Sequence, residues 1–303
     1  MIENHMALIE SICPDLNLIA RGKVRDLYRI DENSLLFVAT DRISAYDVIL
    51  KNGIPGKGKI LTQISVFWFK YLKDIVPNHL ITCDLNDMPE VLQKYKDQLE
   101  HRCMLVKNLK VLQVEAIVRG YITGSAWSEY KQKGSICDIP LPEGLQESQS
   151  FETPLYTPST KAEIGQHDQN IHPSKASEII GENFAHDIAK ISIQLYTKAR
   201  DYAFKKGIII ADTKFEFGID SNKIIYLADE VLTPDSSRFW LSSKYEIGRS
   251  QDSFDKQYVR DYLTSIGFDK KTSIALPDYI IQKTREKYIE AYKLLTGDEP
   301  DFL

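Results

Sequence analysis

The clearest alternation of apolar and polar positions lies near residue 210. Residues 207–218 open with consecutive β-branched side chains, which predicts a buried strand. The second half of this run alternates, so Asp212, Lys214 and Glu216 would share one face of the strand. Turn residues follow at 218–222, and another apolar run comes directly after them, so we expect a β-hairpin.

This hairpin would gather acidic side chains. If its strands pair without a bulge, Asp229 lies level with Asp212, beside the charged face. Crowded carboxylates repel one another and are costly to remove from water unless a cation neutralises them. Oxygen ligands suit Mg²⁺, which also bridges nucleotide phosphates. The alternative is a solvated face of an edge hairpin, but the apolar setting and the polar segment 232–240 favour the metal site.

Weaker patterns predict the other elements. We expect strands at 35–40 and within 101–121, and helices at 61–72, 91–99, 177–206, 253–263 and 277–295, the last of them packed on the outside of the core. Residues 134–158 are rich in Pro, Glu, Gln, Ser and Gly, which predicts a flap rather than a linker between domains.

Residues 53–59 nearly match the P-loop pattern, but two positions argue against one. Ile60 stands where a serine or threonine would contact Mg²⁺. Pro55 removes a backbone N–H from a loop that would bind phosphate through such groups. We therefore expect a plain glycine-rich turn into the following helix.

Composition limits the class of protein. The chain has 303 residues, enough for one large or two linked domains, and its 43% hydrophobic and 27% charged residues are typical of globular proteins. A net charge of −5 implies no general attraction to nucleic acid or to a membrane surface. Its four cysteines include no C-x-x-C pair, which argues against a zinc site or a disulfide framework. No signal-peptide pattern or membrane-spanning run is present, so we expect a cytoplasmic protein.

Two short basic segments could bind anions. Lys23 and Arg25 lie one strand period apart beside Gly22, and can hold a polyphosphate or form a solvated surface hairpin equally well. Glu115 and Arg119 share one face of a strand, where they can bind a ligand or pair with each other.

Three later segments add further candidate ligands. Ser125 suits a helix start that binds an anion through free N–H groups. The polar stretch 159–170 is typical of a ligand loop, and its Asp168 can reach a metal through water. Lys256 and Arg260, four residues apart, would share one face of a helix.

Taken together and in order, these motifs resemble one known family. Residues 21–26, 39–47, 114–120, 123–127, 212–218 and 229–240 resemble the SAICAR synthetases, which are phosphoribosylaminoimidazole-succinocarboxamide synthases of purine biosynthesis. The resemblance runs from about residue 21 to residue 260, and the last two motifs are the most specific. The chain length and residues 134–158 resemble the longer, yeast-like members more than the compact bacterial ones.

The resemblance implies an α+β fold of two lobes with the nucleotide in the cleft between them, related to the ATP-grasp and protein-kinase arrangement. Residues 1–113 would form a β-rich nucleotide-binding lobe, and residues 114–303 an α+β lobe that carries the metal and substrate sites. The implied ligase joins the carboxylate of carboxyaminoimidazole ribotide (CAIR) to the amine of L-aspartate. ATP becomes ADP and phosphate, with an acyl phosphate as the intermediate. The implied partners are these small molecules and Mg²⁺, without nucleic acid or membrane, for a monomer or homodimer.

The resemblance also assigns roles to individual residues. ATP would be bound by Gly22, Lys23, Val24, Arg25, Glu115, Glu216 and Asp229. Mg²⁺ would be held by Glu216 and Asp229, with Asp168 contributing. CAIR and L-aspartate would be bound by Asp47, Arg119, Ser125, Asp168, Ser237, Lys256 and Arg260, and the catalytic group would be Lys214, Asp235 and Arg238. In this assignment Lys214 neutralises charge on the carboxylate that is being activated.

Two alternatives remain open from sequence. A small-molecule kinase on the same architecture would use the Mg²⁺ carboxylates identically but would need no second, amine substrate. A nucleotide-binding module without catalysis would bind ATP without turnover, although the density of acidic and basic residues argues against it.

Overall fold

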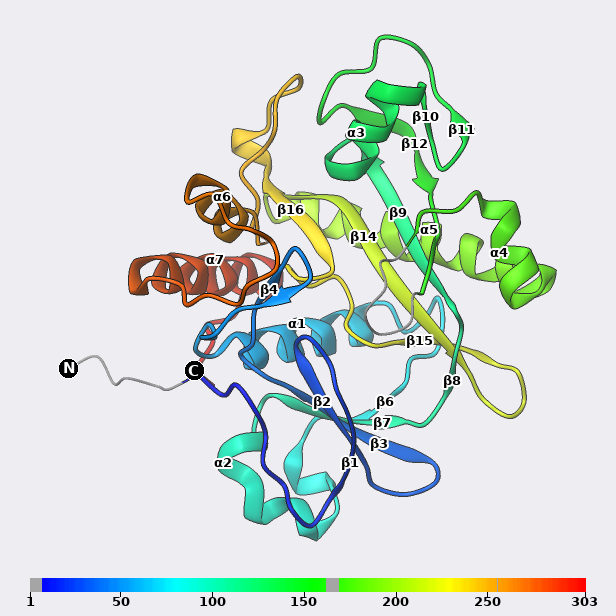
Figure 1. Ribbon diagram of the computed structural model, residues 1–303. Helices are drawn as coiled ribbons and strands as arrows, with labels where there is room; N and C mark the ends of the chain where they lie inside the picture. The colour runs from blue at the N-terminus through cyan, green and yellow to red at the C-terminus, as the bar shows by residue number, and fades with distance from the viewer. Residues whose placement is uncertain (1–6, 162–168, 255) are drawn as a thin grey trace.

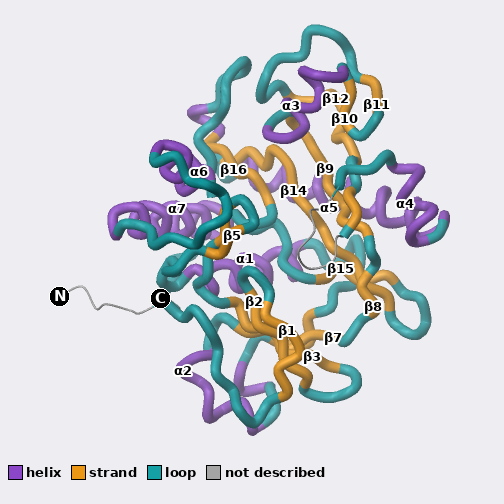
Figure 2. Tube along the Cα trace, viewed as in Figure 1, coloured by secondary structure: helices purple, strands orange, loops and turns teal. Residues whose placement is uncertain are grey.

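The computed structural model describes residues 7–161, 169–254 and 256–303. Within these residues the strands form two main antiparallel groups, and helix α1 (Lys57–Tyr71) passes between them (Figures 1 and 2). The main hydrophobic core contains residues from α1, from both groups of strands and from helices α5 (Glu182–Lys205) and α7 (Asp278–Thr296). The two groups of strands are therefore joined by one continuous core.

The first sheet has five strands in the order β1-β2-β3-β7-β6. Their bounds are Asn17–Arg21 for β1, Arg25–Arg29 for β2, Ser34–Ala39 for β3, Leu80–Thr82 for β6 and Cys103–Lys107 for β7. Because side chains alternate along a strand, Leu36 and Val38 enter one small core while Leu35 and Phe37 pack against the main core. The small core is covered by the 3₁₀ segments Leu85–Asp87 and Glu90–Tyr95 and by α2 (Lys96–Leu99).

The second sheet has seven strands around a long central strand, β14. Its members are β8 (Lys110–Val111), β9 (Val114–Tyr121), β12 (Ser150–Tyr156), β13 (Ser159–Thr160), β14 (Ile208–Ile219), β15 (Ile225–Ala228) and β16 (Ser237–Leu241). The β14–β15 hairpin confirms the prediction from the alternating pattern. Helix α5 lies across this sheet (Figure 1), and the hydroxyl of its Tyr196 donates a 2.6 Å hydrogen bond to the carbonyl of Ile210.

The register of the hairpin differs from the prediction. Glu216 pairs with Ala228, so the next residue, Asp229, comes level with Phe215 and not with Asp212. The strands stay paired as far as Ile219 and Ile225, which places the turn later in the chain than we expected. The expectation that Asp229 would lie level with Asp212 is therefore wrong, and Asp229 approaches Glu216 instead.

Four of the five predicted helical regions are helical with shifted ends, whereas the helix predicted over 91–99 is a 3₁₀ segment, Glu90–Tyr95, followed by the single turn of α2. Helix α1 begins at Lys57, and the region predicted as one helix over 177–206 is two helices, α4 (Pro173–Ile180) and α5, separated by Gly181 at φ 87°. Helices α6 (Gln257–Ser265) and α7 lie near their predicted positions. As predicted, α7 packs on the core from outside: one face, with Tyr288 and Leu295, is buried and the opposite face is exposed. No helix among the described residues has the length and apolar character needed to span a bilayer.

Residues 134–158 fold against helix α3 (Gly124–Lys133) rather than standing alone. They include the small pair β10 (Ser135–Ile136) and β11 (Ile139–Pro140) and then strand β12. Ile136 and Cys137 are buried with Ala126 of α3 in a separate small core. The remaining short elements are β4 (Ser44–Ala45), β5 (Val48–Ile49) and the 3₁₀ turn Ser242–Lys244.

Replacing Tyr196 with Phe should lower the free energy of unfolding by about 1–2 kcal/mol, because the buried carbonyl of Ile210 loses its hydroxyl partner. Denaturant titration measures this change. Tyr279→Phe is the matched control, since Tyr279 is 60% exposed and should tolerate the same deletion. Equal stabilities for the two variants would contradict a structural role for the α5–β14 contact.

Candidate functional site

A cluster of acidic and basic side chains surrounds the middle of β14. Lys214 Nζ lies 2.5 Å from Glu115 Oε1 on β9 and 4.0 Å from Glu216 Oε1, while Lys161 forms an ion pair with Glu216. Burial opposes the charged ammonium, but the carboxylates of Glu115 and Glu216 raise the pKa of Lys214. The Ser159 hydroxyl donates a 2.9 Å hydrogen bond to Glu115. Lys214 is thus a fixed cation between two carboxylates.

The first sheet reaches this cluster through Arg25. Its guanidinium lies 2.5 Å from Asp229 Oδ2 and 3.3 Å from Glu230 Oε1. Asp229 has a left-handed backbone with φ 64°, which is uncommon outside glycine. Burial raises the pKa of Asp229 to about 6; Arg25 opposes this shift, and the nearby charges of Glu216 and Glu230 reinforce it. Asp229 is therefore an acid that a further cation would favour in its ionised form.

Backbone hydrogen bonds connect the two sheets beside Arg25. The N–H of His79 donates to Leu227 O at 2.9 Å, and the N–H of Lys107 donates to His79 O at 2.8 Å. The His79 ring is buried between Phe37 and Phe69, and burial together with the charge of Arg25 lowers the pKa of His79 to about 3. The hairpin acids thus stand at the junction of the two sheets.

The residues present can accept a divalent cation. Four carboxylates (Glu115, Glu216, Asp229 and Glu230) meet three cations (Arg25, Lys161 and Lys214), which leaves one negative charge in excess. Among the described residues there is no group of three or more acids, histidines or cysteines placed to hold a metal by themselves. Mg²⁺ commonly takes one or two carboxylates and completes its shell with water and phosphate, so Glu216 and Asp229 fit that role. Asp168, predicted as a further metal and substrate ligand, lies outside the described residues.

A second cluster lies two residues earlier on β14. Asp212 accepts hydrogen bonds from Arg119 Nη1, at 3.2 Å, and from Arg238. Arg119 also donates through Nε to Thr157 Oγ1 at 2.9 Å. Glu115 and Arg119 therefore do not pair with each other, the alternative that their spacing had left open. The structure instead gives each of them an opposite charge on β14.

Arg238 lies against the start of helix α3. A Cβ atom built on Gly124 would be 2.5 Å from Arg238 Nη2, so a side chain here would displace the guanidinium, and the φ of 58° also favours glycine. Ser125 is the second residue of the same helix. The Ser237 hydroxyl is within 2.8 Å of the Thr213 hydroxyl on β14. Arg238, Ser125 and Ser237 thus come from elements that meet beside Asp212.

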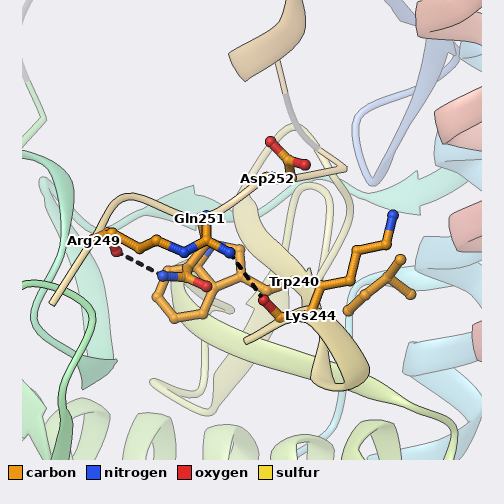
Figure 3. Close-up of a pocket in the computed structure, with 6 residues that line it drawn as sticks. Trp240, Lys244, Arg249, Gln251 and Asp252 are labelled. Carbon is orange, nitrogen blue, oxygen red and sulfur yellow. Dashed lines mark hydrogen bonds between the residues drawn. The ribbon is translucent and has the colours of Figure 1, made fainter. Parts of the chain in front are cut away.

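Two cavities open near Arg238. The larger, of about 350 Å³, is lined by Thr123, Gly124, Trp127, Ser128, Lys131, Glu147, Arg238, Trp240, Ser250, Gln251, Ser253 and Gln257. The smaller, of about 220 Å³, is lined by Trp240, Leu241, Lys244, Arg249, Gln251 and Asp252 (Figure 3). Neither of these two cavities is lined by the hairpin carboxylates. The larger one places the basic side chains Lys131 and Arg238 in the same space.

A third cluster centres on Asp235; sequence reasoning named Asp235 and Lys256 but missed their partners Lys57 and Tyr288. Lys57, the first residue of α1, is 0% exposed, and its Nζ lies 2.7 Å from Asp235 Oδ2. Lys256 Nζ is 3.2 Å from the same oxygen, and the Tyr288 hydroxyl of α7 donates to the other one. Burial raises the pKa of Asp235, but Lys256, Lys57 and Tyr288 outweigh it and hold the pKa well below its usual range. The only sequence signal was a lysine between two glycines at the start of a helix, which we had assigned to a turn.

The other predicted residues lie apart from these clusters or at their edges. Lys23, in the turn between β1 and β2 that also contains Gly22 and Val24, forms an exposed ion pair with Asp47. Lys23 and Arg25, which we placed together over one phosphate chain, therefore have different acidic partners in this structure. Arg260 lies on α6, one turn after Lys256.

Comparison with known proteins supplies the family. The family model for SAICAR synthetase matches residues 18–275. Phosphoribosylaminoimidazole-succinocarboxamide synthase from Pichia angusta is 58% identical over 93% of this chain and 95% of that relative. The synthase from the bacterium Maridesulfovibrio salexigens is 55% identical over 97% of this chain and 98% of that relative, so long members also occur in bacteria.

Solved structures agree with this result. SAICAR synthase from Saccharomyces cerevisiae, solved in complex with SAICAR, aligns with a TM-score of 0.89 at 51% identity over 96% of this chain and 98% of that one. A SAICAR synthetase in complex with ADP aligns with a TM-score of 0.69 at 28% identity over 93% of this chain and 99% of that one. The mixed α and β fold described above is therefore the SAICAR synthase fold. With matches over nearly its whole length, the chain belongs to the SAICAR synthetase family of purine-biosynthesis ligases.

Proposed function

We propose that this ligase joins the carboxylate of CAIR to the amine of L-aspartate at the expense of ATP, and releases SAICAR, ADP and phosphate. The observation that carries the proposal is the placement of two opposite charge clusters two residues apart on β14. Lys214 and Glu216 belong to a cluster with excess negative charge, while Asp212 binds two arginines. One strand thus offers a cation site beside an anion site, as a reaction between a nucleotide and an anionic substrate requires.

On the nucleotide side, the hairpin acids and Arg25 are the proposed ligands. Glu216 and Asp229 would hold Mg²⁺, which neutralises phosphate charge when it is bound. Arg25 and Lys23, with the turn at Gly22 and Val24, would contact the phosphates, and Glu115 the ribose hydroxyls. This places the nucleotide between an N-terminal lobe, residues 1–113, and a C-terminal lobe, residues 114–303, in the manner of ATP-grasp proteins and protein kinases.

On the substrate side, the proposed ligands surround Arg238. Arg119 and Arg238 are suited to bidentate contact with phosphate or carboxylate. CAIR and L-aspartate would be held by these arginines together with Asp47, Ser125, Ser237, Lys256 and Arg260. The complexes with SAICAR and with ADP named above belong to relatives of this chain, and they support the pairing of a ribotide site with a nucleotide site.

The proposed chemistry follows from the substrates. A carboxylate is a poor electrophile, so a CAIR carboxylate oxygen attacks the γ-phosphorus of ATP, and ADP leaves. The aspartate amine then attacks the acyl carbon, loses a proton and expels phosphate. Lys214, held by Glu115 and two residues from Asp212 along β14, would offset the charge of the carboxylate and the phosphoryl group as they approach. Positioning and charge neutralisation suffice for such a transfer, without a nucleophilic side chain from the protein.

Asp235 would act by holding its loop. Its carboxylate is buried, with Lys57 and Tyr288 behind it, and the loop continues into Ser237 and Arg238. A lysine buried at the base of this loop therefore fixes the residues that would bind CAIR. In cells the enzyme would work in the cytoplasm, as a monomer or a homodimer.

Lys214→Ala should reduce kcat by about 100-fold or more while leaving the protein folded, because the charge that offsets the two reacting anions is lost. ADP release that depends on both CAIR and L-aspartate measures the rate. The mass of the product shows whether an aspartyl or only a phosphoryl group was added. Lys110→Ala, an exposed lysine on β8 of the same sheet, is the control. A Lys214→Ala enzyme with near-normal kcat would remove this residue from the mechanism.

Glu216→Gln should raise the Mg²⁺ concentration needed for half-maximal rate by about tenfold, because one charged oxygen ligand is replaced by a neutral amide. The measurement is a Mg²⁺ titration of the rate at saturating ATP. Glu152→Gln, at an exposed position of β12, should leave the titration unchanged. An unaltered titration for Glu216→Gln would exclude it as a metal ligand.

Lys57→Met should lower the free energy of unfolding by about 3 kcal/mol, since the buried carboxylate of Asp235 loses one of its charge partners. Combining it with Asp235→Asn should restore part of this loss. Chemical denaturation of the single and double variants gives the coupling, and Lys70→Met, an exposed lysine of α1, is the control. Additive losses in the double variant would show that the two residues do not act as a pair.

A further inference from the structure

Two loops that are distant in sequence meet beside the larger cavity. The first, residues 144–149, ends the segment between β11 and β12, and the second, residues 242–252, follows β16. Figure 1 shows both at the same end of the molecule as α3. We call their contact the Ser148 tie, formed by Glu147 and Ser148 on one side and Tyr245, Gly248 and Arg249 on the other.

Three hydrogen bonds make up the Ser148 tie. Ser148 Oγ donates to the carbonyl of Arg249 at 2.8 Å, and the Tyr245 hydroxyl donates to the carbonyl of Ser148 at 2.8 Å. The N–H of Gly248 donates to the carbonyl of Glu147, also at 2.8 Å. Ser148 is completely buried, although it lies in a loop. Its hydroxyl and carbonyl thus join the first loop to the second, most of whose residues are exposed.

The first loop is fixed independently of the second. The N–H of Ser148 donates to Ile122 O at 2.8 Å, and the N–H of Ile122 donates to Gln149 O at 2.9 Å. Ile122 directly follows β9, the strand that carries Arg119, and precedes α3. Ser148 also adopts a left-handed backbone, with φ 62°, a strained conformation that the surrounding hydrogen bonds maintain. The tie is therefore anchored to the central sheet.

The second loop is ordered by its own contacts. Gln251 donates to the carbonyls of Glu246 and Arg249 and accepts from the N–H of Glu246 at 3.0 Å (Figure 3 shows its bond to Arg249). The Tyr245 ring stacks on Trp240, with an angle of 11° between the ring planes. Two ordered loops joined by a buried serine form a stable wall.

Both loops contribute to the lining of the larger cavity. Glu147 lines it from the first loop, Ser250 and Gln251 line it from the second, and Arg238 and Lys131 provide its basic side chains. Ser148 itself does not line the cavity. Loosening the tie would therefore change the shape of the cavity without removing any group that faces a ligand there.

We propose that Ser148 is a positioning residue for the anionic ribotide substrate. It fixes the two loops that line the cavity beside Arg238. Because these loops are already ordered, substrate binding does not have to include the loss of their conformational entropy. This inference rests on the proposed function, because it takes CAIR as the ligand next to Arg238. The segment 134–158 is then part of the substrate site. The nucleotide cluster on the hairpin, which the tie does not touch, is unaffected.

The test is a separation of kinetic constants in Ser148→Ala, Tyr245→Phe and the double variant. Each single variant removes one hydrogen bond of the tie, and Tyr245→Phe keeps the stack on Trp240. We expect the KM for CAIR to rise about fivefold in each single variant and at least tenfold in the double variant. The KM for ATP and kcat should stay within about twofold of wild type, because the charge clusters on β14 remain in place. Ser150→Ala, an exposed serine two residues away, should match wild type throughout.

An unchanged KM for CAIR in Tyr245→Phe and in the double variant would overturn the proposal. So would a parallel rise in the KM for CAIR and the KM for ATP, since general destabilisation affects both. If Ser148→Ala fails to fold, Tyr245→Phe decides the matter alone. Wild-type protein that does not consume CAIR with L-aspartate contradicts the proposed function itself. If the wild-type enzyme does consume them and the variants have an unchanged KM for CAIR, only the role of Ser148 is contradicted.

Discussion

The pairing of β14 with its two neighbours is the constraint on which the charge arrangement depends. On one side Asp212 pairs with Arg119 of β9, and on the other it pairs with Arg238 of β16. Because side chains alternate along a strand, fixing Asp212 between two arginines also fixes Lys214 and Glu216 on the same face. A register shift of one residue would turn all three away from their partners. The separation of the anion and cation clusters is therefore a property of the strand itself.

Neutralisation allows this much charge to be buried. Asp212, Asp235 and Asp229 each lie within hydrogen-bonding distance of at least one Arg or Lys, and the first two have two cations each. Burying an isolated charge in such surroundings would cost several kcal/mol. Removing one partner of a buried ion pair would therefore be costly too, because the remaining charge would be left without a counter-charge. Among the described residues of these three clusters, only the one on the hairpin has more carboxylates than cations, and the pKa of its Asp229 is raised. A divalent cation therefore has a physical reason to bind there and not beside Asp212.

The sequence predicts what is periodic or local, and it fails where distant segments decide the outcome. The alternation over residues 207–218 predicted the strand and its hairpin, because apolar and polar residue types alternate with the period at which a strand buries its side chains. The level of Asp229 was wrong because the position of the turn sets the register, and the turn lies two residues later than the glycine at 218 suggested. Lys57 was missed because its partner, Asp235, lies 178 positions further along the chain, in the loop before β16, and only the tertiary fold brings them together. The family resemblance supplied residue types for the site, but it could not supply these contacts.

Residues 134–158 show how a segment can shape a cavity while contributing few of the residues that line it. The polar composition predicted a flap. It could not predict that Ser148 is buried and hydrogen-bonded to a second loop, because that contact depends on distant residues. Charge neutralisation is carried by strands of the central sheet, whose register is rigid, whereas the shape of the cavity beside Arg238 comes from loops joined by three hydrogen bonds. Changes in those loops alter the walls of the cavity and leave the strand register intact. Substrate fit can therefore vary among such ligases while the charged groups on β14 stay in place.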